Sequence, residues 1–91
     1  MSPLANRTIA TVGSGVMAEA MIAGLLRGRL VEPEQVVASH PRVERREQLA
    51  REYGIRVVAD NREAVEGADI VLLAVKPQML IRVGREIAPA L

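Results

Sequence analysis

The sequence predicts an α/β fold built on a parallel sheet, and three observations support this class. Short apolar runs alternate with longer runs of helical spacing along the 91 residues, as in parallel α/β sheets. Residues 70–75 are apolar without alternation, which is typical of a strand covered on both faces. A glycine-rich turn at residues 13–15 lies between a predicted strand and a predicted helix. We therefore expect a Rossmann-like doubly wound parallel sheet of about four strands, in the order 3-2-1-4.

The predicted elements follow local signals along the chain. Strands are expected over residues 8–12, 36–39, 55–58 and 69–75, and helices over residues 16–27, 41–53 and 61–66 and from residue 77 onward. Gly28 and Gly54 are expected to end the first two helices. Pro41 and Pro77 fit the first turn of the second and last helices, and Asn61 fits a helix cap. The buried faces are predicted at Val43, Leu49, Ala50 and Tyr53 in the second helix, and at Leu80, Val83, Ile87 and Leu91 in the last.

The glycine turn has the context of a dinucleotide site, because a strand precedes it and a helix follows it. Gly13 lets the chain turn tightly, and Gly15 has no side chain to keep a diphosphate from the backbone. Ala18 takes the third-glycine place, where a small residue lets the helix lie close to the strand. The diphosphate is then expected on the free amides and the positive dipole end of the helix. The alternative is a left-handed turn that only connects two elements.

The end of the second predicted strand indicates the type of dinucleotide. An acidic residue there selects NAD, whereas basic residues accept the 2′-phosphate of NADP. Here no acid stands at the strand end, and Ser39, His40 and Arg42 are suited to hold a phosphate through charge-assisted hydrogen bonds. We therefore expect NADP(H), with NAD(H) as a possible substitute. His40 could equally be a loop histidine that has no ligand.

Two further arginines, Arg45 and Arg46, lie early in the same predicted helix, where their charges oppose the helix dipole. Either they share in phosphate binding, or Glu44 and Glu47 neutralise them on a solvated face. The end of the fourth predicted strand, residues 74–77, lies at the ligand-binding edge of such sheets. Its Lys76 either reaches a phosphate or is simply solvated, and Asn61 either faces the adenine or caps a helix.

Composition and charge argue against several function classes. With 12 basic and 11 acidic residues the net charge is +1, unlike that of proteins that bind nucleic acid by bulk electrostatics. Tyr53 is the sole aromatic residue, so platforms for base stacking are missing. The chain has no cysteine, which excludes disulfides and thiolate metal sites and is compatible with the expected cytoplasmic location. No apolar run approaches the roughly 20 residues that span a bilayer, so no membrane partner is expected. No metal partner is expected either.

The fourth predicted strand would be the outer edge of the sheet in the order 3-2-1-4. A long apolar edge is a hazard that proteins normally cover or pair. We therefore expect residues 1–91 to be the N-terminal part of a larger enzyme, or another chain to cover this edge in a homo-oligomer. A self-sufficient half-Rossmann domain whose last helix folds back is the alternative.

Over nearly all of its length the chain resembles the N-terminal domain of pyrroline-5-carboxylate reductase. The resemblance rests on residues 12–20 (VGSGVMAEA), 38–41 (ASHP), 60–61 (DN) and 69–78 (DIVLLAVKPQ), of which AVKP at 74–77 is the most specific. It implies reduction of the C=N bond of 1-pyrroline-5-carboxylate to give proline, by hydride transfer from NADPH or NADH. By position it implies cofactor contacts at Val12, Gly13, Ser14, Gly15, Val16, Met17, His40, Asn61, Ala74, Val75, Lys76 and Pro77.

The chain departs from that family in two respects. Val16 stands where members often carry asparagine, which removes a side-chain donor near the diphosphate. The helical C-terminal domain that binds the imine and forms the dimer in that family is missing, and we name no catalytic residue. The 91 residues are thus expected to hold the cofactor without turning over substrate. Two other readings are a related NADP-linked oxidoreductase of the coenzyme F420-dependent type, and a non-enzymatic nucleotide-sensing domain that assembles through its apolar edge.

Overall fold

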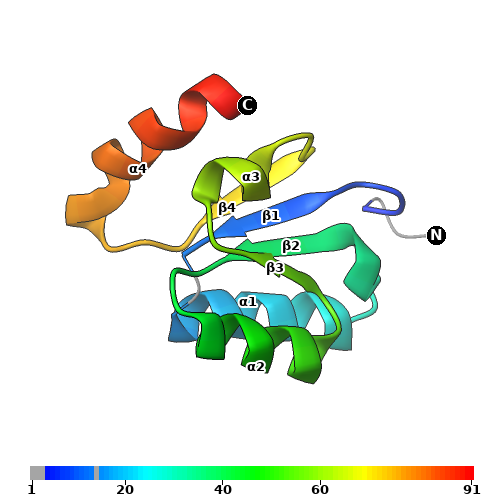
Figure 1. Cartoon of the computed structure of the whole chain (residues 1–91). Coiled ribbons are helices and arrows are strands. Elements are labelled where there is room, and N and C mark those ends of the chain that lie inside the picture. The colour runs from blue at the N-terminus through cyan, green and yellow to red at the C-terminus, as the bar shows by residue number, and fades with distance from the viewer. Residues whose placement is uncertain (1–3, 14) are drawn as a thin grey trace.

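A computed structural model describes residues 4–13 and 15–91 of the chain. The strands are β1 (Ile9–Val12), β2 (Val36–Ser39), β3 (Arg56–Val58) and β4 (Ile70–Leu73), and the helices are α1 (Val16–Arg27), α2 (Val43–Tyr53), α3 (Asn61–Val65) and α4 (Leu80–Ile87). Short 3₁₀ turns cover Pro33–Gln35, Pro77–Met79 and Ala88–Ala90. The four strands form one parallel sheet in the order β3-β2-β1-β4, which confirms the predicted class and order (Figure 1).

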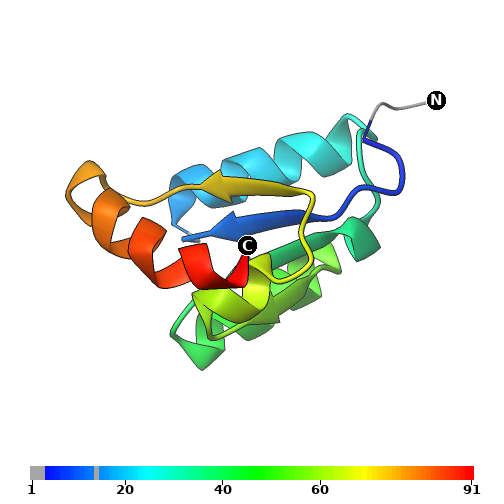
Figure 2. The same cartoon turned by 90° about the horizontal axis from the view of Figure 1, so that it is seen from above.

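The sheet is covered on both faces, with α1 and α2 on one side and α3 and α4 on the other (Figure 1). Strand β1 supplies both halves of the core because its side chains alternate between the faces. Ile9 packs with Ile22 of α1 in one cluster, whereas Val12 packs with Val65 and Val83 in the other. Seen from above, β4 lies at the outer edge of the sheet and α4 runs beside α3 (Figure 2).

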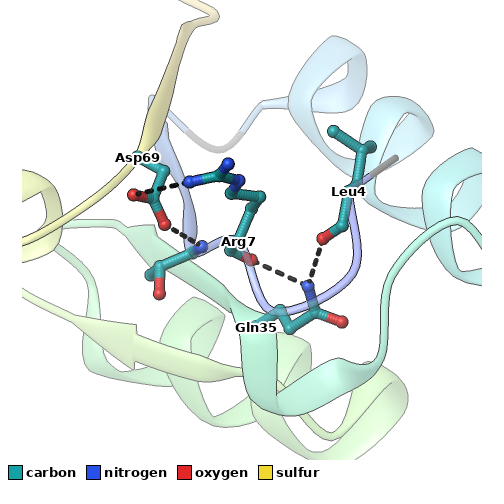
Figure 3. Close-up of polar contacts among 5 residues, drawn as sticks. Leu4, Arg7, Gln35 and Asp69 are labelled. Atoms are coloured by element: carbon teal, nitrogen blue, oxygen red, sulfur yellow. Dashed lines mark hydrogen bonds and ion pairs between the residues drawn. The ribbon is translucent and has the colours of Figure 1, made fainter. Parts of the chain in front are cut away.

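The amino-terminal segment is fixed at the amino ends of the strands (Figure 3). The side-chain amide of Gln35 donates to the carbonyl oxygens of Leu4 and Arg7, each at 2.8 Å. The backbone amide of Thr8 donates to Asp69 Oδ2 at 2.8 Å, and the guanidinium of Arg7 lies 4.0 Å from the other oxygen of that carboxylate. These contacts hold the entry to β1 at the end of the sheet opposite the glycine turn.

Helix α1 ends at Arg27 with Gly28 as its C-cap, as predicted; Gly28 is right-handed, and the left-handed residue is Arg29 (φ 56°), whose amide donates to the carbonyl of Leu26. Two other helix boundaries differ from prediction. Helix α2 begins at Val43, so Pro41 precedes the helix. The cap of α3 is the Asp60 side chain, which accepts from the backbone amide of Arg62 at 2.9 Å, so Asn61 is not the cap. Gly54 ends α2 in the left-handed conformation (φ 71°), as predicted.

The predicted buried faces are only partly confirmed. Leu49 of α2 and Val83 and Ile87 of α4 are buried, and Tyr53 is half-buried. The predictions for the remaining positions were wrong, since the following side chains are exposed: Val43, Ala50, Leu80 and Leu91. Strand β4 is shorter than residues 69–75, and its side chains are only partly buried, with Ile70 and Leu72 packed against one core cluster and Val71 against the other. Leu73 at its end is 41% exposed. Its outer edge has no strand partner among residues 4–13 and 15–91.

Candidate functional site

Gly13 is required by the backbone in two ways. Its φ of 83° lies in the left-handed region, which residues other than glycine rarely adopt because their Cβ is unfavourable there. A Cβ at this position would also lie 2.6 Å from the carbonyl oxygen of Ala74 and 2.9 Å from Val75 Cγ1. The turn after β1 therefore packs directly on the chain that leaves β4, which agrees with the predicted tight turn.

Gly15 has a different role, because its backbone is unstrained and the space above it is open. It is the N-cap of α1 with φ −77°, and a Cβ added there would meet no atom within 4 Å. No side chain of the described residues caps the helix, although its first turn carries amide donors that need partners. Ala18, one turn into the helix, is fully buried against the sheet, as expected for the third-glycine place.

The glycine turn and the segment after β4 together line a groove of about 290 Å³, which is formed by Gly15, Val16, Met17, Ala74, Val75, Lys76 and Pro77. The structure thus brings together two segments that the sequence places far apart. Val16 and Met17 are 87% and 71% exposed and give this groove an apolar rim. Ser14 lies outside the described residues. A larger cavity, about 390 Å³, is lined by Arg29, Val31 and Pro33 among others and contains none of the predicted site residues.

At the end of β2, the structure connects three polar side chains from three elements. Ser39 is buried, and its hydroxyl donates to Asn61 Oδ1 at 2.6 Å. Asn61 Nδ2 in turn donates to Glu86 Oε1 at 2.6 Å. The sequence predicted Ser39 and Asn61 as separate site residues and missed Glu86, because its position depends on how α4 packs beside α3.

His40 and Arg42 follow directly and remain near the surface. The ring nitrogen Nδ1 of His40 accepts the backbone amide of Arg42 at 3.0 Å, so the neutral ring carries its proton on Nε2. Burial of the ring, with the positive charges of Arg45 and Arg42, lowers the pKa of His40 below its usual value. The guanidinium of Arg42 is exposed and makes no hydrogen bond or ion pair with the described part of the chain.

The other two arginines near the end of β2, Arg45 and Arg46, make structural contacts. Arg45 forms an ion pair with Glu19 of α1, whose other carboxylate oxygen accepts the Tyr53 hydroxyl at 2.7 Å. Arg46 donates to the carbonyl oxygens of His40 and Pro41, each at 2.9 Å, and so braces the loop after β2. The sequence left open whether neighbouring glutamates neutralise Arg45, and the structure pairs it with Glu19 of the other helix.

Glu19 and Tyr53 shift each other's pKa through the hydrogen bond between them. The hydrogen bond from Tyr53, reinforced by Arg45, lowers the pKa of Glu19. The same bond raises the pKa of Tyr53 to about 12.

Within residues 4–13 and 15–91, no cluster of three or more His, Asp or Glu side chains is arranged to hold a metal ion. No helix in the described part is long and apolar enough to cross a membrane.

Known proteins resemble this chain in both sequence and fold. Pyrroline-5-carboxylate reductases from Synechocystis sp. and Pseudomonas aeruginosa are 44% and 47% identical over 79% and 91% of this chain. A pyrroline-5-carboxylate reductase structure from Coxiella burnetii superposes with a TM-score of 0.84 at 26% identity, over 91% of this chain and 30% of that one. A Plasmodium falciparum pyrroline carboxylate reductase solved with NADP bound gives a TM-score of 0.78 at 23% identity, over 94% of this chain and 30% of that one, which supports the fold alone.

These matches confirm the resemblance found in the sequence and also define its extent. The chain spans only 27% and 30% of the length of the Synechocystis and Pseudomonas relatives. A family model described as NADP oxidoreductase, coenzyme F420-dependent, matches residues 8–91. Taken with the parallel sheet, the open helix terminus at Gly15 and the groove beside it, this match means that the chain belongs to the family of NADP oxidoreductases of the coenzyme F420-dependent type.

Proposed function

We propose that residues 1–91 form the NADP(H)-binding domain of an oxidoreductase that reduces 1-pyrroline-5-carboxylate to proline. The observation that carries the proposal is the open space over Gly15, between the first turn of α1 and the segment after β4. A diphosphate there receives backbone amides and the positive end of the helix dipole. The names of the relatives support the substrate, since the matches from Synechocystis and Pseudomonas are pyrroline-5-carboxylate reductases.

When bound, the nicotinamide supplies the hydride that the C=N carbon accepts. The role of this chain is to hold and orient the coenzyme. Gly13, Gly15 and the amides that follow take the diphosphate, and the groove from Ala74 to Pro77 lines its other side. Arg42, with its exposed guanidinium, and the Nε2 proton of His40 are the donors that we assign to the 2′-phosphate.

In this proposal, the imine pocket and the proton donor come from protein beyond these 91 residues. The relatives are more than three times as long as the matched region, and the outer edge of β4 and the nearby side chains of Leu73 and Ile81 are exposed. Residues 1–91 would then be the N-terminal part of a larger enzyme, which we expect to be a homo-oligomer. Its cytoplasmic location and the absence of nucleic-acid partners remain predictions.

Calorimetric titration with NADPH and NADH tests the cofactor assignment. We expect tighter binding of NADPH, with the preference lost in Arg42→Glu because a negative charge then faces the phosphate. Arg51→Glu is the matched control, since it makes the same charge change at the far end of α2 and should keep the preference. A wild-type preference for NADH would refute the phosphate site at His40 and Arg42.

The family match favours a second candidate, in which the hydride passes between NADP and coenzyme F420. Assays of the longer protein with 1-pyrroline-5-carboxylate and with oxidised F420 separate the two, because each candidate predicts turnover of one substrate only. The non-enzymatic sensing domain predicts assembly that depends on NADPH, which sedimentation velocity of the 91-residue chain detects. A dilute monomer with or without NADPH would exclude it.

A further inference from the structure

The loop after β2 carries both groups that we assign to the 2′-phosphate, His40 and Arg42. The loop is fixed at its start, because the amide of His40 donates to the carbonyl of Val58 in β3 at 2.9 Å. It passes into α2 at Arg42, the N-cap, which makes no side-chain hydrogen bond to the helix. Between these points stands Pro41, which has no amide hydrogen to donate. The shape of the loop therefore depends on what its carbonyl oxygens bind.

Arg46, near the start of α2, binds these carbonyl oxygens. Its Nη1 donates to the carbonyl oxygens of His40 and Pro41, each at 2.9 Å, and its backbone amide donates to the carbonyl of Arg42 at 3.1 Å. Within residues 4–13 and 15–91, no backbone amide reaches the carbonyls of His40 and Pro41. One residue thus holds the successive carbonyl groups of the whole loop.

These contacts also fix the direction of the loop amide. A trans peptide unit is planar, so the carbonyl of Pro41 and the amide hydrogen of Arg42 point in opposite directions. Arg46 binds that carbonyl, and Nδ1 of His40 accepts that amide at 3.0 Å. The unit is therefore held at both ends. The Nε2 proton of His40 and the guanidinium of Arg42 have no partner in the described part of the chain, so both stay available to a ligand.

We propose that Arg46 is a positioning residue that favours NADPH over NADH by holding His40 and Arg42 in the arrangement that receives the 2′-phosphate. The proposal rests on the NADP(H) function proposed above and concerns the discrimination between the two coenzymes. Arg46 acts through the loop and needs no contact with the coenzyme. NADH carries a hydroxyl at that place and gains less from the same donors, because hydrogen bonds to a charged group are stronger.

Arg46→Met tests the proposal, because methionine keeps an unbranched stem and removes both side-chain contacts. By calorimetry we expect NADPH to bind about tenfold more weakly, as for one lost hydrogen bond to a charged group, and NADH to change by less than about twofold. Arg51→Met is the matched control, since it removes an arginine at the far end of α2 and should keep both affinities. Arg46→Gln, which is too short to reach the carbonyls, should repeat the result. An unchanged affinity ratio in both Arg46 variants would overturn the proposal.

Loss of the Arg46 charge also weakens the attraction for any phosphate, and an Arg42→Met background separates the two effects. If Arg46 acts through the loop, Arg46→Met lowers NADPH affinity by less than about threefold in that background, because one of the positioned donors is already gone. An equal loss in both backgrounds would mean that the charge acts directly, and the positioning role would be wrong.

The ring of His40, the single histidine of the chain, gives a measurement that needs no coenzyme. Above the pKa of the ring, its ¹⁵N resonances should show the Nε2–H tautomer in the wild-type chain and a mixture in Arg46→Met, because a loosened loop lets the Arg42 amide leave Nδ1. A change of charge alone would shift the pKa of the ring and leave the tautomer unchanged.

These measurements keep the two proposals separable. If the wild-type chain shows no preference for NADPH, the phosphate site fails, and the role of Arg46 in selectivity fails with it. If NADPH is preferred but either the affinity ratio or the tautomer ignores Arg46→Met, the cofactor function stands and the role of Arg46 is refuted.

Discussion

Substitution of Gly15 by valine should abolish coenzyme binding while the fold persists. The backbone at Gly15 has φ −77°, which valine adopts without strain, and an added Cβ meets no protein atom within 4 Å. Loss of glycine from this N-cap costs about 1 kcal/mol of stability. The branched side chain fills the space that we assign to the diphosphate. Two lost hydrogen bonds to a charged group, at roughly 1.5–3 kcal/mol each, weaken NADPH binding by at least about a hundredfold.

Gly13→Ala provides the contrasting control. Its φ of 83° and the 2.6 Å approach to the Ala74 carbonyl oxygen make any side chain unfavourable whether or not a ligand is present. The left-handed conformation and the overlap together cost roughly 2–5 kcal/mol, so thermal unfolding should occur at clearly lower temperature. Calorimetry with NADPH and thermal melts of both variants give the comparison. A folded Gly15→Val chain that binds NADPH as well as wild type would refute the site.

Three further predictions concern stability and titration. Arg29→Gly should raise the free energy of unfolding by about 1 kcal/mol in urea, because glycine relieves the left-handed strain at φ 56°; no gain would contradict this. Asp60→Ala should cost about 1 kcal/mol in the same assay, whereas Asp60→Asn keeps the cap of α3. Tyr53 should titrate near pH 12 by ultraviolet absorbance and closer to its ordinary value in Glu19→Gln. Because the pKa is raised in the folded state, this stabilisation is complete below about pH 10 and is lost as the pH rises toward 12; a normal wild-type titration would exclude the hydrogen bond.

The order of elements and the glycine turn were predictable because they depend on local patterns. The alternation of apolar runs fixes which segments are strands, and a parallel sheet of this kind has a strongly preferred order. The roles of Gly13 and Gly15 follow from the same context. The sequence could not show that Gly13 is needed against Ala74, since that contact joins segments that are distant along the chain.

Predictions failed where tertiary contacts compete with local preference. Pro41 fits the first turn of a helix, but α2 begins only at Val43. Asn61 and Asp60 are both good caps, and only the packing of α3 decides between them. Glu86 could not be found from the sequence, because nothing local indicates which side of α4 approaches Asn61.

The contact between Gly13 and Ala74 also links the glycine turn to an edge strand of the sheet, β4. The amide of Ala74 donates to the carbonyl of Val12 at 2.9 Å and the side chain of Val75 packs at Gly13, so the chain after β4 is tied to the turn by a hydrogen bond and by close packing. Fraying of β4 would therefore loosen the turn at the same moment, and amide hydrogens of both segments should exchange with solvent at matching rates. Any protein that docks along the outside of β4 would slow this exchange and tighten the turn without approaching the coenzyme.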